Sequence, residues 1–97
     1  MITTSSKDEA QRISQALLEQ KKAACVNIIP NIGSSFWWNG KIDSSREYLL
    51  IVKTKASLLN ELVNIVKQMH SYEIPEVIAL PVVGGNSEYL KWIDETI

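Results

Sequence analysis

The sequence predicts a small α+β domain, a split βαβ sandwich in which an antiparallel sheet carries its helices on one face. Strand-like and helical patterns alternate along the 97 residues in the order β-α-β, β-α-β and a final helix, which is typical of this architecture. Asn39-Gly40 separates two long strand-like arms, and Asn-Gly is the strongest short signal for an antiparallel hairpin. A chain of this length builds one core, so we expect residues 1–97 to form a single domain.

Three segments have the pattern of helices. Ser5 or Ser6 can cap a helix over residues 7–22, with two acidic residues in its first turn. Apolar residues at helical spacing predict a second helix over residues 56–69. Asn86 or Ser87 can cap a last helix that continues through Ile93.

The pattern of strands occurs at residues 2–4, at residues 23–29 with a stop or bend at Pro30, and at residues 34–38 after the chain resumes at Ile32. Residues 41–43 and 47–53 form the returning strand, and residues 77–83 are a buried or edge strand. Both hairpin arms exceed the usual length of about 5–6 residues, so their outer end needs something else to pack against. Trp37 and Trp38 point to opposite faces of their strand. We expect one indole in the core and the other covered by a subunit interface or stacked on a ligand.

The composition argues against several classes of function. A net charge of −1 provides no basic field for a nucleic acid. No apolar run approaches the roughly 20 residues of a membrane span. The first residues lack the pattern of a secretory signal, and a single cysteine forms no internal disulfide, so we expect a cytoplasmic protein.

The richest chemistry lies in residues 70–76, His-Ser-Tyr-Glu-Ile-Pro-Glu, which include the only histidine of the chain. Pro75 ends any helix and stiffens the loop before the next apolar run. Imidazole binds copper(II) and zinc(II), and Glu73 and Glu76 are the nearest carboxylates by sequence. One cysteine and one histidine cannot build a closed four-ligand zinc site, so any metal site is open and unnecessary for folding. The alternative is a solvated loop after a capped helix.

Other candidate residues have plainer interpretations. We interpret Cys25 as a buried, inert thiol on an apolar strand, and Lys41 and Lys53 as solvated. The chain has neither a nucleophile with a base in one motif nor a phosphate loop, so we do not expect an enzyme. Arg12 and Asn27 suggest the alternative of a small acylphosphatase-like hydrolase, by analogy of fold alone.

Several motifs together resemble the CutA divalent-cation-tolerance family. They span nearly the whole chain in order: Ala23-Ala24-Cys25-Val26-Asn27-Ile28-Ile29-Pro30, Trp38-Asn39-Gly40-Lys41-Ile42, Ile51-Val52-Lys53-Thr54, residues 70–76, and Tyr89-Leu90-Lys91-Trp92. The resemblance implies a ferredoxin-like sandwich and a compact homotrimer, similar in architecture to PII signalling proteins. In that trimer each long hairpin extends the sheet of its neighbour.

The resemblance also implies a function without an enzymatic reaction: binding of a divalent cation such as copper, or of a small ligand, in clefts between subunits. Residues at the matching positions would line the cleft: Trp38, Lys53, His70, Tyr72, Glu73 and Glu76. This chain has Ser71 where the family usually has proline, and Ile2 where some members have a candidate copper-ligand cysteine. A trimeric scaffold for an unidentified protein partner is a further alternative.

Overall fold

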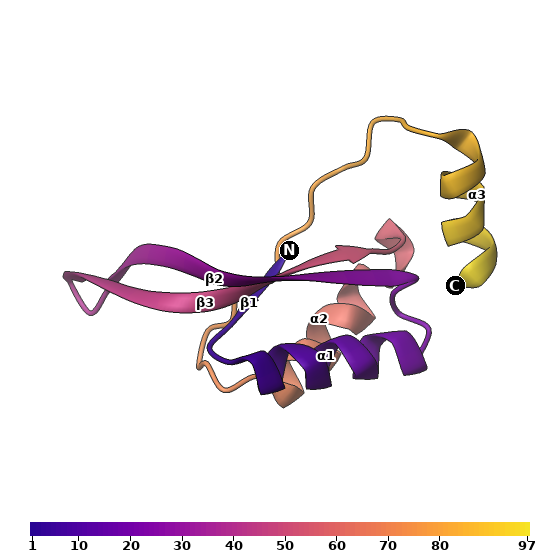
Figure 1. Ribbon diagram of the computed structural model, residues 1–97. Coiled ribbons are helices and arrows are strands. Elements are labelled where there is room, and N and C mark those ends of the chain that lie inside the picture. Colours follow the sequence, from indigo (N-terminus) through magenta and orange to yellow (C-terminus); the bar gives the residue numbers. More distant parts are fainter.

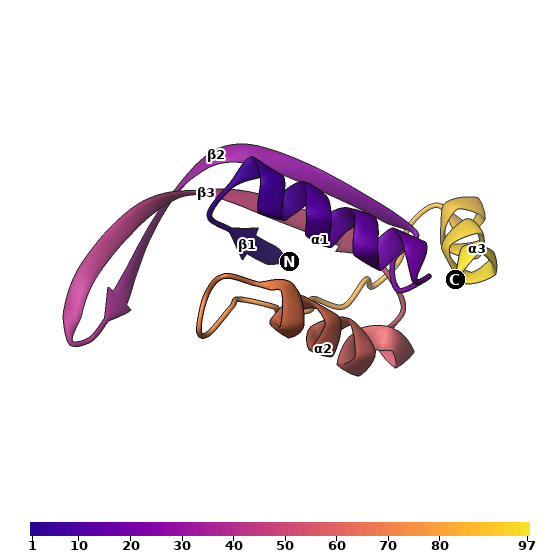
Figure 2. The same ribbon diagram turned by 90° about the horizontal axis from the view of Figure 1, so that it is seen from below.

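The computed structural model describes residues 1–97, which form three strands and three α-helices. The elements in chain order are β1 (Ile2–Thr4), α1 (Lys7–Glu19), β2 (Cys25–Trp38), β3 (Lys41–Lys53), the 3₁₀ turn η1 (Ala56–Leu58), α2 (Leu59–Met69) and α3 (Ser87–Thr96). Helices α1 and α2 lie side by side under the sheet, whereas α3 stands on its other side (Figures 1 and 2). The predicted α+β class, with an antiparallel sheet and a long central hairpin, is confirmed; α1 and α2 share one face as predicted, but α3 does not.

The sheet has the order β1-β3-β2, with both pairs antiparallel. Asn39 and Gly40 adopt φ angles of 51° and 76°, the positive values that a type I′ turn requires at both central positions. Trp38 therefore pairs with Lys41, and the hairpin continues until Cys25 pairs with Lys53. The Asn-Gly prediction of the hairpin is confirmed.

An irregularity at Pro30-Asn31 divides the hairpin into two halves. Ile29 pairs with Leu49 but Ile32 pairs with Glu47, so two residues of β2 lie opposite one residue of β3. Asn31 takes a φ of 59° there, and Pro30 has no N–H to donate to the ladder. The predicted stop or bend at Pro30 is thus a bulge within one continuous strand. We call residues 32–47, beyond the bulge, the outer hairpin.

The helices follow the predicted pattern with shifted ends. The Ser6 hydroxyl caps α1 by accepting the Glu9 N–H, but α1 ends at Glu19 rather than at residue 22. Lys21 has a φ of 58°, which turns the chain away from the helix axis toward β2. The Asn86 side chain caps α3 by accepting the Glu88 N–H, and α3 runs to Thr96, beyond the predicted Ile93.

The core lies between α1, α2 and the inner half of the sheet. Its buried apolar members are Ile2, Ala10, Ile13, Leu17, Ala23, Leu50, Leu62 and Val66. Only 12 of the 97 residues are buried, so a single chain has a small core. The radius of gyration, 14.2 Å, exceeds the roughly 12.5 Å expected for a compact domain of this length. The outer hairpin, which extends away from the helices, accounts for this elongation (Figure 1).

The prediction of a strand over residues 77–83 is wrong for the single chain. Val77 forms one isolated bridge with Ile2, and the backbones of Ile78 and Met1 exchange two hydrogen bonds of 3.1 and 2.7 Å. Beyond that point the segment is extended but exposed, and Val83 is 99% accessible. The physical reason is that a strand needs a partner edge, and β1 offers only three residues.

The prediction that one indole of the Trp37-Trp38 pair enters the core is also wrong. Trp37 is 72% exposed and Trp38 is 44% exposed. The outer hairpin reaches past α1 and α2, so neither of its faces has a helix to cover it (Figure 2). None of the helices has the length and apolar content needed to cross a membrane.

Candidate functional site

The loop after α2 is fixed by a buried polar network that starts at Glu9. This carboxylate lies in the first turn of α1, and the residue is only 3% exposed. Glu9 Oε2 accepts the Ser71 N–H at 2.7 Å, and Oε1 accepts the Ser5 N–H at 3.2 Å. The network therefore ties the start of α1 to a residue 62 positions later in the chain.

Burial opposes ionisation of Glu9 and is the largest single influence on its pKa. Hydrogen bonds from the hydroxyl and N–H groups of Ser71 and from the N–H of Ser5 outweigh it and hold the pKa below its ordinary value. The carboxylate is accordingly ionised at neutral pH. A negative charge here also suits the positive end of α1.

His70 is enclosed by backbone groups. Its side chain is fully buried; Nδ1 accepts the Tyr72 N–H at 3.1 Å and Nε2 lies 2.7 Å from the Thr3 carbonyl oxygen. A carbonyl oxygen only accepts, so this geometry assigns the proton to Nε2 of a neutral ring. Glu9 Oε1 lies 4.0 Å from Nδ1. A metal ion would reach either nitrogen only after one of these hydrogen bonds broke.

Tyr72 connects the same loop to the sheet. Its hydroxyl donates to Glu47 Oε2 at 2.6 Å, and Glu47 is 6% exposed. Burial, followed by the hydrogen bond to Glu47 and the charges of Glu47 and Glu9, raises the pKa of the Tyr72 phenol above its ordinary range. The phenol thus remains a hydrogen-bond donor throughout the neutral range.

Glu73 and Glu76 are both exposed, unlike His70 and Tyr72 of the same loop. Neither carboxylate takes part in a side-chain hydrogen bond or an ion pair within the chain. Pro75 lies between them, so the segment that carries them has a restricted backbone. Both carboxylates are open to solvent, and the charge of Glu76 acts on the nearby Met1 ammonium, where it opposes the lowering of the ammonium pKa by burial.

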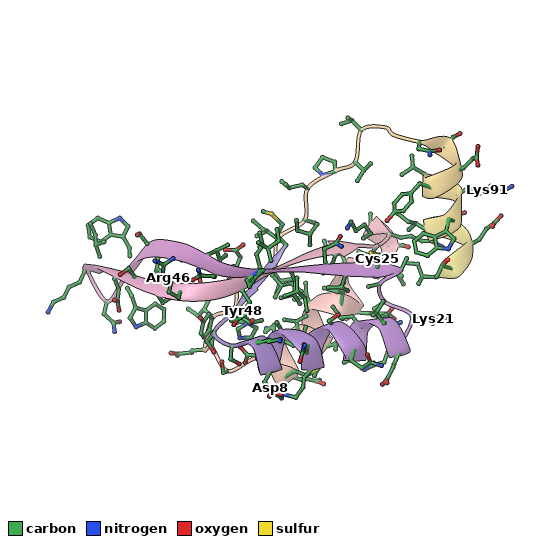
Figure 3. The ribbon with its side chains drawn as sticks, in the orientation of Figure 1. Asp8, Lys21, Cys25, Arg46, Tyr48 and Lys91 are labelled. Atoms are coloured by element: carbon green, nitrogen blue, oxygen red, sulfur yellow. The ribbon has the colours of Figure 1, made fainter.

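A second polar group lies at the inner end of the hairpin, where Cys25 pairs with Lys53. Lys53 Nζ is 4.0 Å from Cys25 Sγ, and the thiol is only half-buried. Desolvation, and then the adjacent Cys25, raises the pKa of the Tyr89 phenol on α3. Side chains of α3 reach toward Cys25 from above the sheet (Figure 3). Cys25 therefore has a cation and a phenol beside it, and its half-buried position differs from the predicted buried thiol.

The predicted cleft residues do not meet within one chain. Trp38 is at the turn of the hairpin, where a shallow hollow is lined by Trp38, Asn39, Lys41, Ile42 and Asp43. Lys53 is at the opposite end of β3, twelve residues from Lys41, which corresponds to roughly 40 Å of strand. Nowhere in the chain do three or more His, Cys, Asp or Glu side chains gather closely enough to hold a metal ion.

Two members of the network, Glu9 and Glu47, are absent from the residues predicted as functional. Glu9 has a sequence signal, because Ser6-x-x-Glu9 is a capping-box pattern. Its carboxylate reaches the Ser5 N–H rather than that of the cap residue. No sequence signal predicts that Ser71 or Tyr72 supplies the remaining hydrogen bonds, since both contacts join segments distant in sequence.

Comparison with known proteins places this fold and these motifs in one family. A family model described as CutA1 divalent ion tolerance protein matches residues 1–96. The divalent-cation tolerance protein CutA of Archaeoglobus fulgidus is 51% identical over 96 residues, which cover 99% of this chain and 93% of that protein. Protein CutA 1, chloroplastic, of rice is 48% identical over 92 residues, but these cover 95% of this chain and only 52% of that protein.

Solved structures give the same result. The structure described as the periplasmic divalent cation tolerance protein CutA from Archaeoglobus fulgidus has a TM-score of 0.94 at 52% identity, covering 98% of this chain and 92% of that one. The divalent cation tolerance protein (Cut A1) of Thermus thermophilus has a TM-score of 0.96 at 43% identity, with the same coverage of 98% and 92%. Relatives thus include proteins described as chloroplastic and as periplasmic, and the cytoplasmic location of this chain stays a prediction.

Proposed function

Because this chain belongs to the CutA1 divalent ion tolerance family, we propose that it acts in divalent-cation tolerance as a non-enzymatic homotrimer with cation sites between subunits. The chain spans about half the length of the rice relative, so the function proposed is that of this domain. The observation that carries the proposal is the separation of the predicted cleft residues along the hairpin. A second copy is needed to bring a hairpin turn to the loop or to Lys53 of its neighbour.

The exposed apolar surface supports assembly. Exposed large apolar side chains occur on three separate segments, among them Trp37 and Ile42 on the outer hairpin, Ile74, Leu80, Val82 and Val83 in the loop and the segment after it, and Tyr89 and Trp92 on α3. Exposed apolar side chains that gather into a patch are typical of surfaces that pack against another protein. The outer edge of β2 also carries unpaired backbone groups, which another strand can satisfy.

The free carboxylates support cation binding at the boundary between subunits. Glu73 and Glu76 are exposed and unpaired, whereas both nitrogens of His70 already have hydrogen-bond partners. We therefore assign the first contact of a divalent cation to these two carboxylates. His70 can act as a ligand only if the loop moves so that its hydrogen bond with the Thr3 carbonyl or with the Tyr72 N–H breaks.

Sedimentation equilibrium tests the assembly. We expect a mass three times the 10.9 kDa of the chain at micromolar concentration. A folded monomer under these conditions would overturn the homotrimer. Substitution Ile42→Asp places an unpaired charge on the outer hairpin and should shift the mass downward, whereas Lys67→Asp, an exposed position on α2, serves as the matched control.

Calorimetric titration with copper(II) and zinc(II) tests the cation site. We expect weaker binding for Glu73→Gln and Glu76→Gln, and unchanged binding for Glu19→Gln on the exposed end of α1. Binding that weakens as the pH falls, and more steeply in wild type than in His70→Ala, would show that the imidazole takes part. Equal affinities in wild type and both loop variants would remove the loop carboxylates from the site.

A further inference from the structure

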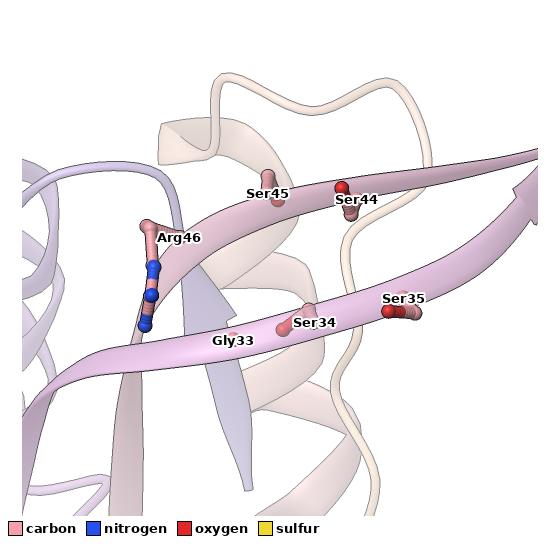
Figure 4. A pocket seen from close by; sticks show the side chains of 6 residues that line it. All are labelled: Gly33, Ser34, Ser35, Ser44, Ser45 and Arg46. Carbon is pink, nitrogen blue, oxygen red and sulfur yellow. The ribbon is translucent and has the colours of Figure 1, made fainter.

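The outer hairpin carries a polar pocket that is not part of the predicted cleft. It lies between β2 and β3 near the bulge, has a volume of about 380 Å³ and contains no hydrophobic lining residue. Its lining residues are Gly33, Ser34, Ser35, Ser44, Ser45 and Arg46 (Figure 4). A pocket without apolar lining favours a small, strongly hydrated ligand over an apolar one.

The charge of the pocket comes from Arg46, which has no partner in the chain. Its guanidinium forms neither an ion pair nor a side-chain hydrogen bond, whereas Arg12, the only other arginine, pairs with Asp8 at 2.9 Å. The adjacent carboxylates form no ion pair with it, and each accepts a different donor. Asp43 accepts the Ser44 N–H, and Glu47 accepts the Tyr72 hydroxyl.

Strand geometry gathers a guanidinium and two hydroxyls on one face. Ser44 and Arg46 are two residues apart and project from the same side of β3, while Asp43 and Glu47 project from the opposite side. Gly33 pairs with Arg46, and Ser35 pairs with Ser44, so all four share that face. Neither the Ser35 nor the Ser44 hydroxyl has a hydrogen-bond partner within the chain.

Gly33 leaves the space beneath the guanidinium open. The side chain of Arg46 extends from β3 across Gly33 on β2 (Figure 4), and a Cβ at Gly33 would lie 3.8 Å from Arg46 Nη1. Absence of a side chain there keeps the planar fork of N–H donors accessible. Such a fork binds two oxygens of one phosphate or carboxylate group, and neighbouring hydroxyls can donate to the remaining oxygens.

We propose that Arg46, with Ser35 and Ser44 over Gly33, forms a binding site for the oxyanion group of a small molecule, a phosphate or a carboxylate. A single hairpin supplies all of these residues, so the inference goes beyond the proposed cation function and does not depend on it. Cation and anion sites then occupy separate regions: the loop after α2 and the middle of the hairpin.

The test is a titration of the ¹⁵N-labelled full chain with inorganic phosphate and with acetate, against sodium chloride at equal ionic strength, monitored by amide chemical shifts. We expect saturable shifts at Gly33, Ser35 and Ser44 with at least one of the two oxyanions and none with chloride. The phosphate and acetate arms distinguish the two sources of the group. Loss of one hydrogen bond to a charged group corresponds to roughly a tenfold or larger loss of affinity, which we expect for Arg46→Gln.

Arg12→Gln is the matched control, because it removes an arginine whose charge is already paired, and its titration should equal that of wild type. The proposal is wrong if Arg46→Gln shows the same saturable chemical-shift changes with the oxyanion as wild type. It is also wrong if sodium chloride produces the same changes in wild type. Sedimentation equilibrium of each variant tests whether Arg46 instead pairs with a carboxylate of another subunit. If Arg46→Gln loses its assembly and wild type shows no oxyanion shift, a carboxylate of another subunit occupies the guanidinium and the proposal is wrong.

Discussion

Substitution of Glu9 by glutamine tests whether the buried carboxylate holds the loop after α2. The change keeps the shape of the side chain and removes its charge. Glutamine has one acceptor oxygen, so it cannot accept at both positions that Glu9 uses, from Ser71 at 2.7 Å and from Ser5 at 3.2 Å. One of these N–H groups would then face an amide NH₂.

The expected cost follows from those contacts. A hydrogen bond to a charged group contributes about 1.5–3 kcal/mol, and a buried donor without a partner is comparably costly. With the side chain only 4% exposed, water cannot easily replace the lost acceptor. We therefore expect Glu9→Gln to lower the free energy of unfolding by roughly 2–3 kcal/mol at pH 7.

The pH dependence gives a second, independent check. The pKa of Glu9 is lowered in the folded state, so its ionised form contributes stability that is complete above the ordinary glutamate pKa of about 4.3. That contribution is lost as the pH falls through the folded-state pKa. Protonated Glu9, like glutamine, carries a donor where the ionised carboxylate has an acceptor. The difference in the free energy of unfolding between wild type and Glu9→Gln should therefore become smaller at acidic pH.

The assay is urea denaturation followed by circular dichroism at neutral and acidic pH, at one fixed protein concentration because assembly adds to apparent stability. Glu19→Gln, which removes an exposed carboxylate that accepts only the Gln15 amide, should change stability by no more than about 0.5 kcal/mol. Equal stability of Glu9→Gln and wild type at pH 7 would refute the reasoning. A difference of the same size at both pH values would refute the assignment to the ionised form.

Three further predictions concern other parts of the chain. Tyr72→Phe removes the donor to Glu47 and should lower the free energy of unfolding by about 1–3 kcal/mol. Because the pKa of the phenol is raised in the folded state, this contribution is complete below the ordinary tyrosine pKa of about 10 and is lost as the pH rises through the folded-state pKa. Denaturation of both proteins at pH 8 and at alkaline pH measures it. Gly40→Ala, at a φ of 76°, should lower the free energy of unfolding by about 1–2 kcal/mol, whereas Gly85→Ala, in open space without positive φ, should leave thermal unfolding nearly unchanged. Trp38→Ala should reduce the sedimenting mass at micromolar concentration; an unchanged mass would exclude this indole from the proposed interface.

The features that the sequence predicted well are those determined by neighbouring residues. Asn39-Gly40 specifies the hairpin because the turn requires positive φ at two adjacent positions. Caps at Ser6 and Asn86 are likewise local. The pairing of Cys25 with Lys53 was harder, because counting back from the turn would place Val26 opposite Lys53, and only the bulge shifts the register by one residue.

The features that the sequence predicted poorly depend on contacts between distant segments. Residues 77–83 have the apolar pattern of a strand, but a strand forms only where an edge of sufficient length is available, and β1 pairs with one of them. Similarly, His70 has the chemistry of a metal ligand, yet its nitrogens bind the Thr3 carbonyl and the Tyr72 N–H. The metal role of His70 stays a prediction, and the buried position of its ring could not be derived from its neighbours in sequence.

The bulge at Pro30-Asn31 also determines how the hairpin would respond to a deletion. Two residues of β2 lie opposite one residue of β3 there, so removal of Asn31 would leave an uninterrupted ladder, with Ile29 still opposite Leu49 and Ile32 still opposite Glu47. Gly33 would remain opposite Arg46. The chain would lose the local bend and the added twist that a bulge gives to its strand. We therefore expect deletion of Asn31 to change the direction in which the outer hairpin leaves the sheet while its strand pairing stays the same.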